Sequence, residues 1–193
     1  MRKLTAQSLC ILILLGLNNT ALAHSGHDIS GLSAGFVHPF RGLDHLLAMI
    51  VIGLWTVQNG GWKIGLLPAT FMLMMTIGAK CALMYPHLPL IETGIAASVL
   101  TLGIITALSL KLSVRLSVAI TALFGLFHGY AHGLEMSEAT GMEAYALGFL
   151  MGTAILHLAG IIIGITTRSR FAQLPHVLGT IVAILGLWLL SFT

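Results

Sequence analysis

Six apolar stretches, each long enough to cross a lipid bilayer, follow one another along this chain. They lie at 30–57, 64–83, 88–110, 114–133, 143–166 and 174–192. Only 8% of the 193 residues are charged, whereas soluble domains carry about 25%. Because about 20 apolar residues span the hydrocarbon core as a helix, the sequence predicts an all-α integral membrane protein with six transmembrane helices.

The first 23 residues have the features of a secretory signal peptide. Arg2 and Lys3 give a positive start, an apolar run follows at 9–17, and Ala-Leu-Ala at 21–23 is a small-residue cleavage site. Cleavage would leave a six-span membrane domain of residues 24–193. An uncleaved anchor helix is the alternative.

The loops between the stretches alternate in charge. One set holds most of the basic residues, namely Lys63, Lys111, Arg115, Arg168 and Arg170. The opposite set holds glutamates at 135, 138 and 143, and no basic residue apart from Lys80 near a helix end. Because cytoplasmic loops are enriched in Lys and Arg, we expect both chain ends outside a bacterial cytoplasmic membrane.

Two other patterns bear on function class and packing. The nine basic residues are scattered, so no nucleic-acid partner is expected, and the absence of a G-x-x-x-x-G-K-[ST] motif argues against ATP use. Glycines recur every fourth residue at 125–133, and again at 148–152 and 160–164. This small-residue spacing predicts closely packed helices.

The first stretch contains an unusual polar segment, HPFRGLDH, at residues 38–45. A charged group at mid-membrane costs roughly 2.5–3.5 kcal/mol, so such a segment serves a purpose or lines a wet cavity. Pro39 and Gly42 predict a kink or a broken helix there. His38 and His45, seven residues apart, share a helix face. Asp44 either orients His45 or acts as a ligand itself.

The fourth stretch carries a matching set of polar residues. His128, His132 and Glu135 in FHGYAHGLE have i, i+4 and i+7 spacing, which places them on one stripe of a helix. A single histidine in a membrane helix commonly makes a helix-to-helix hydrogen bond. Three aligned residues opposite a second such set favour a metal path instead.

Four further residues join this candidate path. Glu92 begins the third stretch and is predicted to be buried, and His157 lies deep in the fifth. After cleavage, the α-amine and imidazole of His24 would chelate a metal together with His27, unless this end is only a solvated polar start. Glu135 and this end are placed outermost, and Asp44, His45 and His157 deepest. Imidazole with carboxylate suits nickel, cobalt or zinc.

Two enzyme-like alternatives use the same residues. Histidines on neighbouring spans can ligate haem, although the adjacent carboxylates count against a haem-binding electron carrier. A membrane zinc hydrolase is the second alternative, and it would hold its metal tightly where a transport site exchanges it. The GLSAG sequence at 31–35 matches G-x-S-x-G but lacks the strand-turn-helix context of a nucleophile elbow.

These motifs resemble the HupE/UreJ family of nickel and cobalt permeases. The resemblance rests on HPFRGLDH, FHGYAHGLE, the glutamate of PLIETGIAAS, and YALGFLMGTAILH. It implies uptake of Ni²⁺ or Co²⁺ without a tightly bound cofactor, in support of hydrogenase, urease or cobalamin pathways. It also implies six metal-handling positions, which are His38, Asp44, His45, His128, His132 and Glu135. The oligomeric state stays open.

Overall fold

The computed structural model describes residues 31–60, 63–136 and 141–193, and within these ranges the chain is helical without any strand. The elements are α2 (Gly31–Val37), η1 (His38–Phe40), α3 (Leu43–Asn59), α4 (Lys63–Met84), α5 (Ile91–Ala107), α6 (Val114–Met136), α7 (Met142–Arg170) and α8 (Leu174–Leu190). The prediction of an all-helical protein is confirmed. The signal peptide, His24 and His27 lie outside the described residues.

Three helices, α4, α6 and α7, are by themselves long and apolar enough to cross a membrane. The bent unit of α2, η1 and α3 makes a fourth if it is one span. The two remaining helices, α5 and α8, have 17 residues each. At 1.5 Å per residue they are about 26 Å long, slightly less than the hydrocarbon core. Six crossings therefore stay a prediction.

The first stretch is broken where Pro39 and Gly42 predicted a break. Gly31–Phe40 and Leu43–Asn59 meet at 76°. Pro39 lacks an amide hydrogen and sits in η1, and Gly42 caps α3 in an extended conformation. A Cβ atom at Gly42 would lie 2.7 Å from the ring of His45 and 2.9 Å from the carboxylate of Asp44. A side chain there would therefore displace both.

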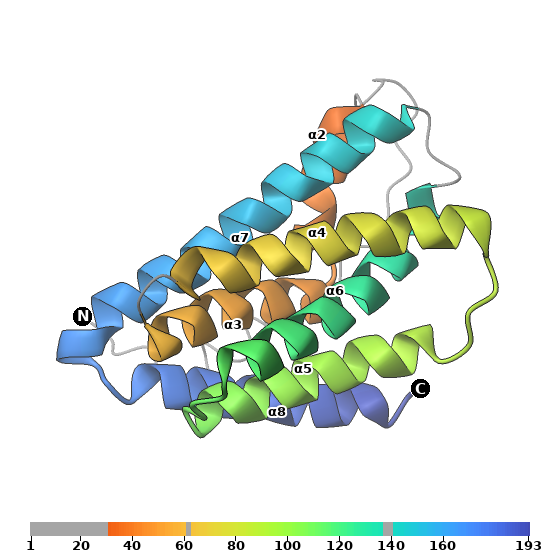
Figure 1. The fold of residues 1–193 in the computed structure, drawn as a ribbon. Coiled ribbons are helices and arrows are strands. Elements are labelled where there is room, and N and C mark those ends of the chain that lie inside the picture. The colour runs from red at the N-terminus through yellow and green to blue at the C-terminus, as the bar shows by residue number, and fades with distance from the viewer. Residues whose placement is uncertain (1–30, 61–62, 137–140) are drawn as a thin grey trace, which may run out of the picture.

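Glycines bring helices into backbone contact in four pairs, one of which is α2 with α7, where Gly148 meets the carbonyl of Leu32. On α6, a Cβ atom at Gly129 would collide with the carbonyl of Met75 on α4. Gly160 of α7 meets the backbone of α3 near Gly53 in the same way, and Gly103 of α5 meets α8. Figure 1 shows α5 and α8 side by side along the lower edge of the molecule. The close packing predicted from the glycine spacing is confirmed.

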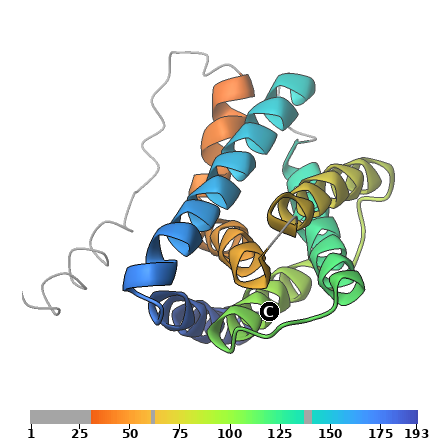
Figure 2. The same ribbon diagram turned by 60° about the vertical axis from the view of Figure 1, so that its left-hand side comes forward.

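Helix α3 forms the centre of the bundle. Every residue from Val51 to Val57 is buried, and α3 packs against α4, α5, α7 and α8. Figure 2 shows it enclosed by these helices. A helix buried all round must have apolar side chains on every face, and α3 has them after its first turn. His45, in that first turn, is thereby held inside the protein.

The two ends of the bundle carry opposite charge. The described carboxylates lie at one end of the bundle. Asp44, Glu92 and Glu143 are in the first turns of α3, α5 and α7, and Glu135 is in the last turn of α6. Lys111 and Arg168 line a pocket at the other end of the same helices. We call these the acidic end and the basic end, although Arg41 and Lys80 also lie at the acidic end.

Candidate metal site

Three predicted ligands meet at the acidic end, and we call them the carboxylate cluster: His38, His132 and Glu135. Glu135 Oε2 lies 2.9 Å from His38 Nε2 and 3.0 Å from His132 Nδ1. One ligand atom from each residue lies within 4.8 Å of the others. The break after η1 brings His38 over the last turns of α6. This arrangement joins the two sequence motifs, as predicted.

Below this cluster lie two histidines in direct contact, which we call the imidazole pair: His45 and His128. Their Nδ1 atoms are 2.7 Å apart, and both residues are buried. The ring of His45 also lies 4.1 Å from that of His132, measured between centroids. The carboxylate cluster and the imidazole pair therefore form one continuous column of rings.

A hydrogen bond to Ser98 determines which nitrogens of the imidazole pair carry hydrogen. Ser98 donates its hydroxyl hydrogen to the carbonyl of Ile95 at 2.6 Å, and its Oγ lies 2.8 Å from His128 Nε2. His128 must therefore donate from Nε2, which leaves Nδ1 of a neutral ring as an acceptor for His45 Nδ1–H. As a result, His45 Nε2 keeps a free lone pair.

The same reasoning applies to the other histidines. His132 Nδ1–H donates to Glu135, and His157 Nδ1–H donates to the carbonyl of Thr153 at 2.9 Å. The Nε2 atoms of His132 and His157 have no hydrogen-bond partner among the described residues. A buried polar atom without a partner costs about 1–3 kcal/mol. These bare nitrogens are thus candidates for metal ligation, each oriented by a hydrogen bond from the same ring.

His157 lies beyond the imidazole pair, behind an aromatic side chain. The ring of Phe71 on α4 is 5.4 Å from those of both His128 and His157. His157 is 2% exposed. Its placement deep in the protein agrees with the predicted order of the path.

Two predicted residues lie elsewhere. Glu92 is exposed at the start of α5, so the prediction that it is buried is wrong. It shares a pocket with Asp44 and the last residues of the chain, away from the carboxylate cluster. Asp44 is only half-buried, and its Oδ2 is 3.9 Å from His45 Nε2. The prediction that Asp44 is among the deepest ligands is therefore also wrong.

Sequence reasoning missed the residues that hold the histidine rings. Ser98 is one of several small polar residues in an apolar helix, and nothing in its spacing distinguishes it. Phe149, with its ring 4.2 Å from that of His132, is likewise one of many apolar residues in α7. Only the structure shows that Phe149 lies on the face of α7 that meets His132 of α6.

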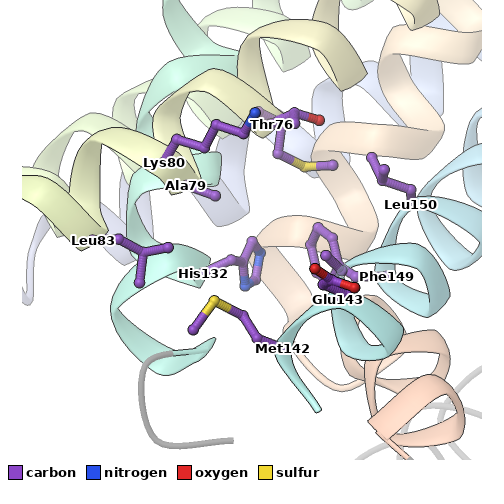
Figure 3. A pocket seen from close by; sticks show the side chains of 11 residues that line it. Thr76, Ala79, Lys80, Leu83, His132, Met142, Glu143, Phe149 and Leu150 are labelled. Atoms are coloured by element: carbon purple, nitrogen blue, oxygen red, sulfur yellow. The ribbon is translucent and has the colours of Figure 1, made fainter.

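A side pocket of about 180 Å³ between α4, α6 and α7 reaches His132. Its walls are mostly apolar, and Figure 3 shows Phe149 and Glu143 of α7 on the side of the pocket opposite Leu83 of α4. Lys80 and Glu143 bring opposite charges to its lining. The ring of His132, which belongs to the carboxylate cluster, therefore also lines this pocket.

Comparison with known proteins agrees with the resemblance seen in the motifs. The family model described as HupE / UreJ protein matches residues 12–189. Protein HupE of Rhizobium leguminosarum bv. viciae is 36% identical over 177 residues, which cover 91% of this chain and 93% of that protein. No solved structure matches the chain. The chain therefore belongs to the HupE/UreJ family of membrane proteins, which is associated with nickel and cobalt transport.

Proposed function

We propose that this protein is a permease that takes up Ni²⁺, with Co²⁺ as a second substrate, along the column of histidines. The observation that carries the proposal is the succession of bare imidazole nitrogens at His132, His45 and His157. Metal ligation requires a nitrogen lone pair. The hydrogen bonds of the column leave one on each of these rings.

The donor set fits a borderline divalent ion. Imidazole with carboxylate suits nickel, cobalt and zinc better than Cu(I), which prefers thiolates and thioethers. Cys81, the cysteine among the described residues, is exposed and not part of the column. The preference for nickel and cobalt over zinc rests on the family.

The arrangement supports a passage in steps. A hydrated ion reaches the carboxylate cluster, where Glu135 supplies negative charge and the ion exchanges water for imidazole. It then moves to the free Nε2 of His45, which the hydrogen bond to His128 keeps without a hydrogen, and on to His157. Each position offers few ligands, so the ion leaves again more readily than it would leave a cage of four histidines.

The direction of transport follows from the membrane orientation that we propose. The protein would cross the cytoplasmic membrane six times after removal of residues 1–23, with both ends outside. The basic end would then face the cytoplasm, as the positive-inside rule requires. A membrane potential contributes about 2.3 kcal/mol per charge per 100 mV. For a divalent ion this is about 4.6 kcal/mol, or roughly a 2000-fold gradient, so uptake needs no ATP.

The geometry argues against the haem alternative. Two axial histidines must lie on opposite faces of a flat macrocycle, yet the rings of the column contact one another at centroid distances of 4.1–4.9 Å. No space for haem separates them. A zinc hydrolase would use the same donors, and it is distinguished by metal that stays bound during purification.

The test is uptake of radioactive nickel into cells that express the protein. His45→Ala and His132→Ala are compared with wild type and with His176→Ala, which alters a histidine at the basic end. We expect saturable uptake by wild type and by His176→Ala, and its loss in the other two variants at equal membrane levels. Absence of uptake by well-expressed wild type, with zinc retained by the purified protein, would support the hydrolase instead.

A further inference from the structure

A separate pocket lies at the basic end, away from the histidine column. It has a volume of about 250 Å³ and is formed by the ends of α3, α5 and α7 and the start of α8. In Figure 1 the link from α7 to α8 lies at the left-hand end of the bundle. The polar side chains in its lining are Gln58, Ser109, Lys111, Arg168 and His176. We propose that this pocket binds the phosphate-glycerol headgroup of an anionic phospholipid.

The pocket carries positive charge that no carboxylate balances. Lys111 and Arg168 are exposed, and neither forms an ion pair among the described residues. The four described carboxylates all lie at the acidic end. Basic pockets between transmembrane helices on the cytoplasmic side are suited to phosphate headgroups. The charge therefore selects an anion.

Hydrogen bonds inside the pocket leave donors and one acceptor ready for a ligand. Gln58 Nε2 donates to Ser109 Oγ at 2.9 Å and to the carbonyl of Thr106 at 3.0 Å. Since Ser109 Oγ already accepts, its own hydrogen is available to a phosphate oxygen. Gln58 Oε1 is buried and has no partner among the described residues. A headgroup hydroxyl would satisfy it, which a simple phosphate ion does less well.

His176 is fixed at the rim of the same pocket. Its Nδ1 lies 2.7 Å from the carbonyl of Ala107 at the end of α5, so Nδ1 carries hydrogen and the ring is held between α5 and α8. This contact joins the start of α8 to the end of α5 and so connects two of the helices that form the pocket.

Apolar surface continues from the pocket toward the membrane. Inside the pocket its apolar lining includes the buried residues Leu54 and Val57. Toward the outside, Ala172 borders a neighbouring hollow with Phe171, Leu174 and Val177, which are exposed. Acyl chains can cover this surface, whereas a free anion would leave it bare. Cations beside the ends of α5 and α7 also complement the helix dipoles, but this role needs neither the donors nor the apolar wall.

The experiment measures phospholipid retained by the full-length protein. The purified protein in detergent is titrated with phosphatidylglycerol, phosphatidylcholine or inorganic phosphate, and bound lipid is counted by native mass spectrometry. The test variant is Lys111→Gln with Arg168→Gln. The matched control is Arg41→Gln with Lys80→Gln, which removes two exposed cations from the acidic end. Lys111→Arg keeps the charge.

We expect wild type, the control and Lys111→Arg to prefer phosphatidylglycerol over phosphatidylcholine. The test variant should bind phosphatidylglycerol about 30-fold more weakly, equivalent to about 2 kcal/mol. Equal weakening in the control, or equal binding of both lipids by wild type, would overturn the proposal. Displacement of the lipid by millimolar inorganic phosphate would identify a free-anion site and overturn the lipid assignment. A failure here leaves the nickel assay unaffected, because no metal takes part.

Discussion

The carboxylate cluster and the buried histidines below it use the same ring in different surroundings. His38 and His132 share a carboxylate that is half exposed, with Glu135 at 52% side-chain exposure. His45, His128 and His157 are buried, and a serine, a carbonyl or another imidazole orients each of them. The negative charge of Glu135, which water can reach, attracts a dication. The buried imidazoles are neutral and out of reach of water, so they let the ion move on.

This difference separates capture from passage. A charged ligand deep in the protein would hold a dication too tightly, and a neutral ligand at the surface would attract it too weakly. The two regions should therefore affect different kinetic parameters. Substitution of His38 or Glu135 should raise KM, whereas substitution of the buried histidines, His132 among them, should lower the maximal rate.

The largest effect is expected at the imidazole pair. His45→Ala removes the ring that connects His132 to the deeper histidines, and the ion would then cross apolar surroundings without a ligand. We expect the maximal rate of nickel uptake to fall at least about 100-fold. Uptake assays at equal membrane levels measure this. A normal maximal rate with a raised KM would mean that His45 belongs to capture.

A smaller effect, of a different kind, is expected at Glu135. Glu135→Gln removes the negative charge but keeps an oxygen ligand, so the ion is captured less well and still passes. KM for nickel should rise about tenfold while the maximal rate stays within about twofold, in the range known for residues that orient metal ligands. Full saturation curves are needed. A collapse of the maximal rate with unchanged KM would remove the distinction between the two regions.

Acidification tests the lone pairs on which both regions depend. A proton on an imidazole occupies the nitrogen that a metal needs, so binding weakens as pH falls. Free imidazole titrates near pH 6.5. Between external pH 7 and 5, with the membrane potential clamped by an ionophore, uptake should fall on the order of tenfold. The loss should appear first in KM, because external water reaches the carboxylate cluster before the buried rings. Constant uptake over this range would contradict capture of the ion by a water-accessible imidazole of the carboxylate cluster.

The sequence predicted the parts of the fold that local chemistry decides. The break at Pro39 and Gly42, the close packing at Gly129 and the alignment of His132 with Glu135 all follow from the geometry of a single helix. The contact between η1 and the end of α6 was expected because the polar residues of HPFRGLDH and FHGYAHGLE were predicted to face each other. Helical periodicity and membrane depth were sufficient for these predictions.

The errors arise where one helix must be placed against several others. Asp44 and His45 are neighbours in sequence, yet the 76° bend before α3 turns His45 into the column and Asp44 toward a pocket shared with Glu92. Glu92 was expected inside because it opens an apolar stretch, but the first turn of α5 lies at the surface. The predicted depth of each residue assumed a straight helix, and that assumption fails where the helix is bent.

The smallest effect is expected at Ser98, which no sequence pattern identified. Ser98→Ala removes the acceptor that holds hydrogen on His128 Nε2. His128 can then donate from Nδ1 instead, which moves hydrogen to His45 Nε2 and occupies its lone pair for part of the time. The maximal rate of uptake should fall about threefold, consistent with the loss of roughly one hydrogen bond, while KM stays unchanged.

Two companion variants make the Ser98 result specific. Ser98→Thr keeps the hydroxyl and should restore the rate. Thr167→Val removes a hydroxyl that bonds only within α7, to Ile163, and should leave uptake unchanged. If Ser98→Ala raised KM and left the rate intact, the buried histidines would take part in capture. The hydroxyl of Thr167 touches no histidine. An equal loss of rate in Thr167→Val would therefore mean that Ser98→Ala lowers the rate only by destabilising the protein. Only a loss confined to Ser98→Ala means that a hydrogen position set on α5 governs passage through rings on α3 and α6.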